Sequence, residues 1–335
     1  MTPGLAAAGL TAFFYGITPV CARRAIRLLG YVKANLARLT VAAVVMGVLA
    51  FTVGRGVGDH YAMFAAAGAL GFGVGGLAMF RALPLLGAPL ASLVVETTAA
   101  FAAAILALVW FADAITAREI TFSLVILTGV VLGLLPYVRG TQRPRVALGA
   151  ALAVLAALAQ AGSAVISRRA LLAIQQAENA AAGGQTPPVG RSIEQVSTAA
   201  FDRLTGGVAV ALVALVLVRL LAGRRAWAKA ALAPAPGVVG GRGPRTELGP
   251  LGNRLPDRAW FWVGANALFG PILGVTAMVW ALQTMQPGVV QAVAAMAPLI
   301  AIPFARWLEG YRPPTGYYPG AVIAVVGLAG LALSA

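Results

Sequence analysis

The chain has 335 residues, of which 60% are hydrophobic and only 10% are charged, and its mean hydropathy is +0.87. A soluble domain carries about 25% charged residues, so this composition excludes a water-soluble fold that covers its own surface. The formal charge of +15 raises nucleic acid as a partner, but the basic residues lie between apolar runs, where they hold helices at a lipid interface. We therefore expect a lipid bilayer around the protein and no nucleic acid as a partner.

Apolar runs of about 20 residues, the length that crosses a bilayer as a helix, follow one another from end to end. The ten predicted spans are residues 5–22, 33–53, 61–81, 88–112, 118–138, 146–173, 196–221, 260–283, 287–308 and 316–334. Charged residues, glycines and prolines separate them. For example, Arg23, Arg24 and Arg27 are expected to end the first span.

Two connections are longer than the others. Residues 174–195 are polar and rich in Gly and Pro. Residues 222–259 combine many Gly and Pro with the basic residues Arg224, Arg225, Lys229, Arg242, Arg245, Arg254 and Arg258. Both segments are expected to be flexible loops outside the membrane.

Three short motifs recur along the chain. The motif RRA at 23–25 recurs at 168–170, RLT at 38–40 recurs at 203–205, and AMxxAL at 78–83 recurs at 277–282. The offset between the copies grows from 145 to 165 and then to 199 residues. These increments match the two long loops, which are therefore interpreted as insertions into the second of two related halves.

Each half then holds five predicted spans, and an odd number means that the second half enters the membrane from the opposite side. We predict an all-α polytopic membrane protein of ten transmembrane helices arranged as two inverted five-helix repeats, a pattern common among transporters. The first repeat is residues 1–140. The second is residues 141–335, with inserted loops at 174–195 and 222–259.

Several residues together carry a family resemblance. In the second half they are Ala281-Leu282, Pro287-Gly288, Pro298, Glu309, Gly320, Gly327 and Gly330, and in the first half Arg38, Ala82-Leu83 and Gly87-Ala88-Pro89. This arrangement resembles the EamA-type domain of the drug/metabolite transporter superfamily. The resemblance implies transport of a cargo such as an amino acid, nucleobase, drug or sugar conjugate. The chain departs from the pattern at Ala99, which stands where Pro298 stands in the other half, and at Asp113, which replaces a Glu.

Glu96 is the strongest candidate for a functional residue, because it lies inside the fourth span. A charged carboxyl at mid-helix costs about 3 kcal/mol or more, and acids in such places are usually functional. Glu96 can bind a cationic cargo, take up a proton in exchange, or do both. The alternative is a structural role, with Glu96 neutral or paired with Arg81. Its counterpart in the other half is near Ala295, so the halves differ here.

Other polar and aromatic side chains in the spans are candidates to complete a cargo cavity. They are Tyr15, Ser92, Thr97, Gln160, Ser163, Asn266 and Trp280. Tyr15 and Trp280 can stack on a planar or cationic cargo. Hydroxyl groups in membrane helices more often bond to neighbouring helices or backbone, which is the alternative for Ser92, Thr97 and Ser163.

Four residues are expected to have structural roles. Arg38 and Arg203 stand at matching places near span heads, where snorkelling to the interface is the favoured interpretation and neutralising an anionic group or a helix end is the alternative. Pro271 and Pro298 are expected to bend their helices, and carbonyls freed at such bends can line a cavity. The glycines of Gly71-x-Gly73-x-x-Gly76 lie inside an apolar span, so they indicate close helix packing and not a dinucleotide site.

The sequence predicts no metal site, because it lacks a Cys/His cluster with zinc spacing, and no cofactor. Two arguments on orientation disagree. Basic residues concentrate in the connections after the first, fifth and seventh spans, which places both termini outside, whereas the family resemblance implies that both lie in the cytoplasm.

The favoured interpretation is a secondary transporter, an exporter or permease for a small metabolite or drug-like molecule, in the cell (inner) membrane. Proton coupling would act through Glu96. A flippase for a lipid-linked sugar and a membrane structural or assembly protein are the alternatives. An enzyme is disfavoured, since the spans hold no paired acids and no histidine. The expected partners are a small-molecule cargo and the bilayer, and the protein is expected to be a monomer or homodimer.

Overall fold

The computed structural model describes residues 3–111, 116–139, 146–181, 193–225, 231–233, 258–309 and 317–334, and within these ranges it contains helices and no strands. The helices of the first half are α1 (Pro3–Leu29), α2 (Tyr31–Thr52), α3 (Tyr61–Gly68), the π-helix η1 (Ala69–Gly75), α4 (Gly76–Leu86), α5 (Ala88–Phe111) and α6 (Ala117–Arg139). Those of the second half are α7 (Val146–Ala181), α8 (Ile193–Ala222), α10 (Ala259–Ala267), the π-helix η2 (Leu268–Gly274), α11 (Val275–Thr284), α12 (Pro287–Ala294), α13 (Ala297–Glu309) and α14 (Tyr317–Ser334).

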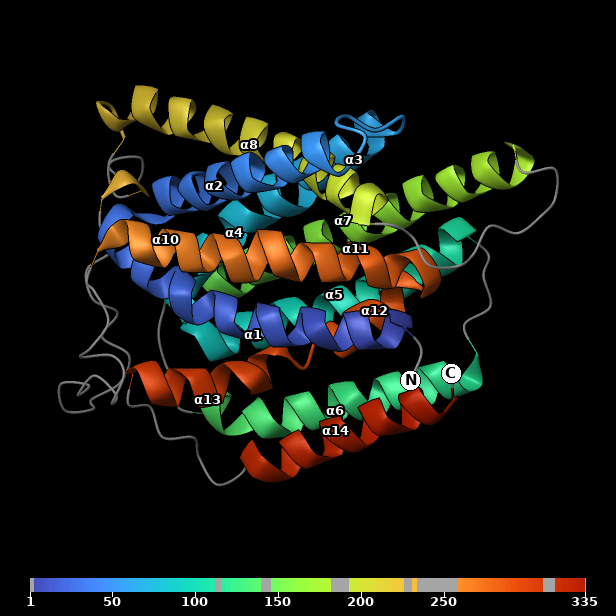
Figure 1. The fold of residues 1–335 in the computed structure, drawn as a ribbon. Helices are drawn as coiled ribbons and strands as arrows, with labels where there is room; N and C mark the ends of the chain where they lie inside the picture. The colour runs from blue at the N-terminus through green and yellow to red at the C-terminus, as the bar shows by residue number, and fades with distance from the viewer. Residues whose placement is uncertain are drawn as a thin grey trace.

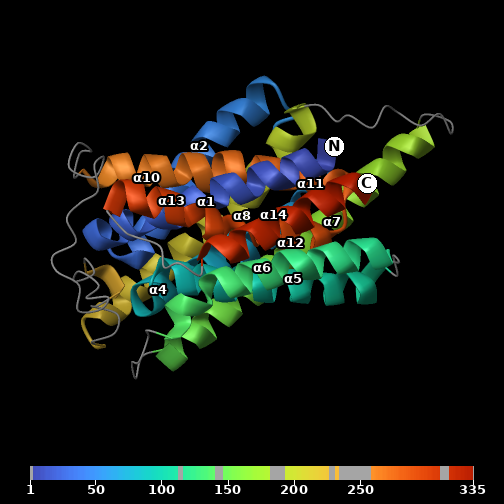
Figure 2. The ribbon, with the colours of Figure 1, turned by 90° about the horizontal axis from the view of Figure 1, so that it is seen from below.

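The helices run side by side as one bundle (Figure 1). Among the described residues, eight helical segments are long and apolar enough to cross a membrane, and the apolar stretch Tyr318–Gly330 is shorter. Helix α6 is not among the eight, so the exact number of ten spans stays a prediction. The two chain ends lie at the same end of the bundle in both views (Figures 1 and 2).

The contacts between helices follow the pattern of an inverted repeat. Helix α1 packs against α10, η2 and α11, and α7 packs in the same way against α3, η1 and α4. Helix α1 also contacts α12 and α13, as α7 contacts α5. The pairs α2–α8, α5–α12 and α6–α14 each join one helix from either half. Exchanging the two halves therefore converts this set of contacts into itself.

The two π-helices give a second sign of the repeat. Segments η1 and η2 are both seven residues long, and they start 199 residues apart (268 − 69), the same offset as the recurring AMxxAL motif. π-Helices are rare and concentrate at functional sites. Their glycines allow close packing: a Cβ at Gly73 would lie 2.5 Å from the Val210 side chain, and one at Gly274 would lie 2.6 Å from Tyr15. The expected packing role of the GxGxxG stretch is confirmed.

Close packing also joins α6 to α14 at the edge of the bundle (Figures 1 and 2). A Cβ at Gly129 would lie 2.4 Å from the Ala324 backbone nitrogen, and one at Gly320 would lie 2.2 Å from that of Gly133. Small residues on both helices therefore bring the backbones together, as is usual in membranes where lipid gives no hydrophobic drive between helices.

Two predicted boundaries are wrong. Helix α1 continues through Arg23, Arg24 and Arg27 and ends at Gly30, whose φ is +80°. Arginine favours helix, whereas glycine adopts this left-handed conformation at little cost. Helix α7 likewise continues to Ala181, well inside the expected loop, because residues 174–181 are mostly Ala, Gln and Glu, which are good helix formers.

Parts of the sequence predictions lie outside the described residues. They are residues 182–192 of the first long loop, 226–230 and 234–257 of the second, and Asp113. The side chains of Pro89 and Glu309 belong to the same group. The division of the chain into repeats at residues 140 and 141 also stays a prediction.

Candidate functional site

A cavity lies between the two halves, near the middle of the helices. Its wall comes from α1, α2, η1, α4 and α5 of the first half and from α7, α8, η2, α11 and α13 of the second. It holds about 880 Å³ of empty space, including the part open to solvent. The cargo residues predicted from the sequence lie in the first, fourth, sixth and eighth spans, so the contributions of α2 and α8 are additions to the prediction.

The Glu96 carboxyl lies in this wall and is 7% exposed. Its Oε2 accepts a hydrogen bond of 3.0 Å from Gln160 Nε2 on α7. The same nitrogen donates to Gln291 Oε1 on α12 at 3.2 Å. One amide group therefore connects an acid of the first half to a side chain of the second, across the surface where the halves meet.

Arg38 enters the cavity from α2 and is 7% exposed. Its Nε and Nη2 donate to Asn35 Oδ1 at 3.0 and 2.9 Å, and its guanidinium lies 4.4 Å from the centre of the Phe80 ring. Asn35 in turn donates to the Phe72 carbonyl oxygen at 3.3 Å. These contacts fix the guanidinium through a neutral acceptor and an aromatic face.

Arg203 takes the matching place on α8 and is 2% exposed. Its Nη2 donates to Ser163 Oγ at 3.1 Å, and its guanidinium lies 5.3 Å from the centre of the Phe72 ring. Its Nε and Nη1 are buried and have no hydrogen-bond partner among the residues that the structure describes. The recurring RLT motif therefore places one buried arginine in each half, and each arginine lies over a phenylalanine ring, Phe80 or Phe72.

Tyr15 of α1 stands among these charged groups. Its phenol donates to Met278 Sδ at 3.4 Å, and the ring lies within electrostatic range of Arg203, Glu96 and Arg38. The three charged side chains therefore line the same cavity as Tyr15, although they come from three different helices.

Five predicted site residues meet in the cavity wall: Tyr15, Ser92, Glu96, Gln160 and Ser163. Three others do not line it. Thr97 donates to the Leu93 carbonyl oxygen at 2.7 Å within its own helix. Asn266 is buried and donates to the Thr18 carbonyl oxygen at 3.0 Å, which joins α10 to α1. Trp280 is 43% exposed on the outer surface.

Two structural expectations about charged groups are wrong. Arg38 and Arg203 do not snorkel to the interface but are buried inside the bundle, because Phe rings and neutral acceptors hold them there. Glu96 is not paired with Arg81, whose guanidinium lies 5.9 Å from the centre of the Tyr31 ring. A missed signal was Asn35, which stands three residues before Arg38 and hence on the same helix face.

Helical irregularities flank the cavity, as the prolines predicted. Pro271 lies inside the π-helix η2 and lines the cavity. Helices α12 and α13 are separated at Ala295 and Met296, just before Pro298. Helix α5 is continuous through the equivalent residue Ala99. The second half therefore has a helix break near the position where the first half has Glu96.

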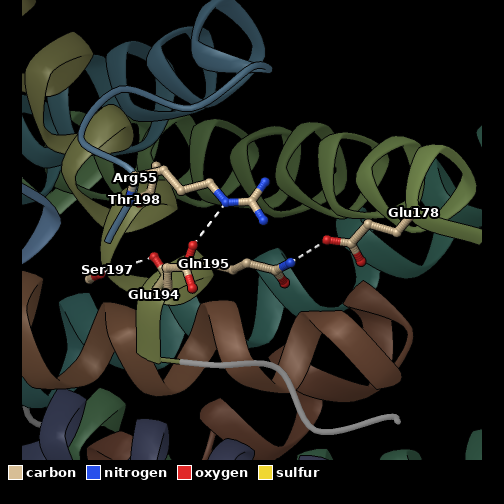
Figure 3. Close-up of polar contacts among 6 residues, drawn as sticks. All are labelled: Arg55, Glu178, Glu194, Gln195, Ser197 and Thr198. Atoms are coloured by element: carbon tan, nitrogen blue, oxygen red, sulfur yellow. Dashed lines mark hydrogen bonds and ion pairs between the residues drawn. The ribbon is translucent and has the colours of Figure 1, made fainter. Parts of the chain in front are cut away.

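Polar contacts join the halves (Figure 3) at the end of the bundle that carries the chain termini (Figure 1). Arg55 follows α2, and its Nε contacts Glu194 Oε1 of α8 at 2.9 Å. Its backbone nitrogen donates to Thr198 Oγ1 at 3.0 Å. Donation to Glu194 raises the pKa of the Arg55 guanidinium, which keeps its charge. Nearby, Gly58 donates through its backbone to Asp202 Oδ2 at 3.1 Å.

Further contacts at this end involve α7. Arg168 Nη1 donates to the carbonyl oxygens of Leu282 and Gln283 at 2.7 and 2.6 Å, at the last turn of α11 where carbonyls lack helical partners. Gln195 donates to Glu178 (Figure 3). The wall of the cavity, in contrast, reaches Leu83, within about one helical turn of the opposite end at Gly87.

Comparisons with known proteins place the fold. No curated protein sequence is significantly similar to the chain. A solved protein whose title reads "Crystal structure of protein" is similar in structure, with a TM-score of 0.63 and 16% identity, over 100% of this chain and 98% of that one. At this identity the similarity supports the fold alone.

The sequence matches a family model in two segments. Residues 2–135 and 247–333 match the model of the EamA-like transporter family, which together make up well over half of the chain. The intervening residues, which include α7 and α8, lie outside the matched segments. The members of this family are membrane transporters of the drug/metabolite superfamily, and the apolar helices agree with a membrane protein. This chain belongs to the EamA-like transporter family.

Proposed function

We propose that the protein is a secondary transporter that carries a small metabolite through the cavity between its halves, in a cell membrane. The observation that carries the proposal is the cavity itself, which lies between the two halves and has the buried Glu96 carboxyl in its wall. Substrate sites of inverted-repeat transporters lie near the midplane at such an interface, beside interrupted helices.

Glu96 serves in this proposal as the site of a proton or of a cationic group of the cargo. The Gln160 amide nitrogen donates hydrogen bonds to both Glu96 and Gln291. Protonation makes the Glu96 carboxyl a weaker hydrogen-bond acceptor and gives it an O–H group that can donate. Protonation would thereby alter the contacts among α5, α7 and α12. Through these contacts, proton binding would affect the arrangement of the two halves.

Alternating access requires that one end closes while the other opens. We assign closure to the end with the Arg55–Glu194 ion pair and the Gly58–Asp202 hydrogen bond, which tie the segment after α2 to α8. Access is assigned to the opposite end, where the wall reaches Leu83. Exchange of the halves' conformations would reverse these roles.

A flippase for a lipid-linked sugar is a second candidate, because it requires a basic headgroup site. The buried arginines Arg38 and Arg203 satisfy this requirement in charge. A purely structural or assembly protein has no use for an acid and two arginines around one cavity, and this arrangement argues against it.

The first test is a thermal-shift screen of the purified protein at two pH values against amino acids, nucleobases, polyamines, cationic drugs and lipid-linked sugars. A ligand at 100 times its Kd adds about 2.7 kcal/mol to stability. We expect one class to stabilise the protein with a pH dependence that Glu96→Gln abolishes. Glu119→Gln is the matched control, since Glu119 caps α6 at Thr116 and glutamine performs the same capping.

If every ligand class leaves the stability of the protein unchanged, the cavity is no cargo site and the proposal fails. If a ligand binds and Glu96→Gln keeps the same pH dependence, the role assigned to Glu96 is wrong. Stabilisation by lipid-linked sugars alone would support the flippase.

A further inference from the structure

The cavity wall has more positively than negatively charged side chains. Among the described residues of the wall, Arg38 and Arg203 are the cations and Glu96 is the acid. The wall is therefore net positive whether or not Glu96 carries its charge. An apolar surrounding opposes such an excess, so a cavity that keeps it is suited to a ligand of opposite charge.

The hydrogen-bond donors of Arg203 point to the same ligand. This side chain is 2% exposed, and within the described part of the chain its Nε and Nη1 have no acceptor. Buried polar groups in proteins nearly always have partners, and an exception calls for a ligand, an ion or a functional role. The partner of Nη2 is the Ser163 hydroxyl, which is neutral.

The groups that hold the Arg38 guanidinium are likewise uncharged. Asn35 Oδ1 accepts from two of its nitrogens, but the amide carries no charge. Glycines leave space around the remaining part of the group, since a Cβ at Gly76 would lie 3.1 Å from Nη2 and one at Gly270 would lie 3.6 Å from Nη1. The Phe80 ring orients the guanidinium plane without supplying an acceptor.

We propose that Arg38 and Arg203 together bind an oxyanion of the cargo, a carboxylate or phosphate group, in this cavity. Guanidinium groups present planar forks of donors that match these two anions. Both arginines line the same cavity, together with Tyr15. The inference rests on the proposed transport function and narrows its cargo to compounds with an acidic group.

The repeat gives this pair of arginines a special value. Arg38 and Arg203 are the same residue of the RLT motif in the two inverted halves. Because the halves of an inverted repeat exchange conformations during alternating access, an oxyanion between the arginines has one guanidinium partner from each half.

The chemistry has two sources, a soluble anionic metabolite or the phosphate of an anionic lipid. The test measures thermal stability of the purified protein at constant ionic strength with glycerol 3-phosphate and succinate as soluble probes and dioctanoyl phosphatidic acid as the lipid probe. Glycerol, dioctanoylglycerol and putrescine are the uncharged and cationic counterparts. We expect a rise in Tm of several degrees with at least one oxyanion and none with its counterpart.

The variant Arg203→Gln is expected to abolish this rise, and Arg203→Lys to retain a part of it, because lysine keeps the charge without the fork. Arg24→Gln is the matched control, since Arg24 is also a buried arginine stacked on an aromatic ring, Trp262 at 4.7 Å, but lies outside the cavity wall. The soluble and lipid probes distinguish a metabolite from a headgroup.

A rise in Arg203→Gln equal to that of the parent protein, or stabilisation by putrescine and by no oxyanion, overturns the inference. If Arg203→Gln does not fold, the comparison of the probes on the parent protein still decides whether the protein binds an oxyanion. Flux of a cation that depends on Glu96 would uphold transport and contradict the oxyanion site. Oxyanion binding without flux would uphold the site and contradict transport.

Discussion

At the scale of single residues, the Gln160 amide is the contact on which the site depends most. Among the described residues it is the hydrogen-bond donor to Glu96, and it also reaches Gln291. Gln160 lies on α7, whereas its two acceptors lie on α5 and α12. The side chain therefore holds three helices around the cavity with two hydrogen bonds.

We predict that Gln160→Ala lowers both stability and transport. A hydrogen bond to a charged group contributes about 1.5–3 kcal/mol, and its loss leaves Glu96 buried without a donor. Thermal unfolding and flux into proteoliposomes measure the two effects. Gln175→Ala is the control, because Gln175 donates to the Gln283 carbonyl oxygen away from the cavity. A Gln160→Ala protein with the stability and flux of this control would refute the role of the amide.

The sequence predicted five of the residues that meet in the cavity, because polar side chains inside apolar spans stand out by cost alone. It did not predict the burial of Arg38 and Arg203. Near span heads, an arginine that snorkels and one that is stacked on a ring inside the bundle have the same sequence signature. The partner rings Phe80 and Phe72 lie in another span, so only the packing of helices reveals them.

At the scale of elements, glycines determine how closely α3 and its continuation η1 approach α8. A Cβ at Gly206 would lie 1.9 Å from the Ala65 carbonyl oxygen, and one at Gly68 would lie 1.6 Å from that of Arg203. Both clashes are with backbone, which cannot rotate away. The position of Arg203 in the cavity therefore depends on small residues at this helix pair.

We predict that Gly206→Ala destabilises the protein and weakens the binding of any ligand at Arg203. Overpacking of this kind costs about 1–3 kcal/mol, because helices must separate to admit the methyl group. Thermal unfolding checks the result, with Gly264→Ala as the control: Gly264 is also helical, and nothing lies within 4 Å of its Cβ position. Equal melting temperatures for the two variants would show that α3 and α8 are not tightly apposed.

The limits of the spans were largely predictable, since apolar runs end where polar residues begin. Exceptions occurred where two signals disagreed. The arginines after residue 22 signalled an end, but helix propensity carried α1 on to Gly30. The π-helices η1 and η2 were not predicted, because the glycine signal of a π-helix is also that of ordinary close packing.

At the scale of the whole molecule, three short motifs predicted the inverted repeat, and the two insertions that their offsets indicate stay a prediction. The contacts between helices and the two π-helices, 199 residues apart, agree with that repeat. The membrane orientation was not decided, because the charge bias and the family pattern disagree. Both termini lie at one end of the bundle (Figure 1), so one measurement fixes the orientation of both.

The charge bias predicts that both termini lie outside the cytoplasm, since basic residues concentrate in the connections at the opposite end. A green fluorescent protein fused to the C-terminus is expected to remain dark, and alkaline phosphatase fused at the same place is expected to be active. A bright fluorescent fusion with inactive phosphatase would place the termini inside and favour the family pattern.

We propose that cargo crosses the membrane through the cavity at Glu96, and flux into proteoliposomes measures this transport. A compound that stabilises the protein would be followed with and without a pH gradient, in the parent protein, Glu96→Gln and Glu119→Gln. We expect saturable flux that responds to the gradient in the parent and Glu119→Gln and loses that response in Glu96→Gln. Flux with the same rate and the same pH dependence in all three would show that transport does not depend on Glu96.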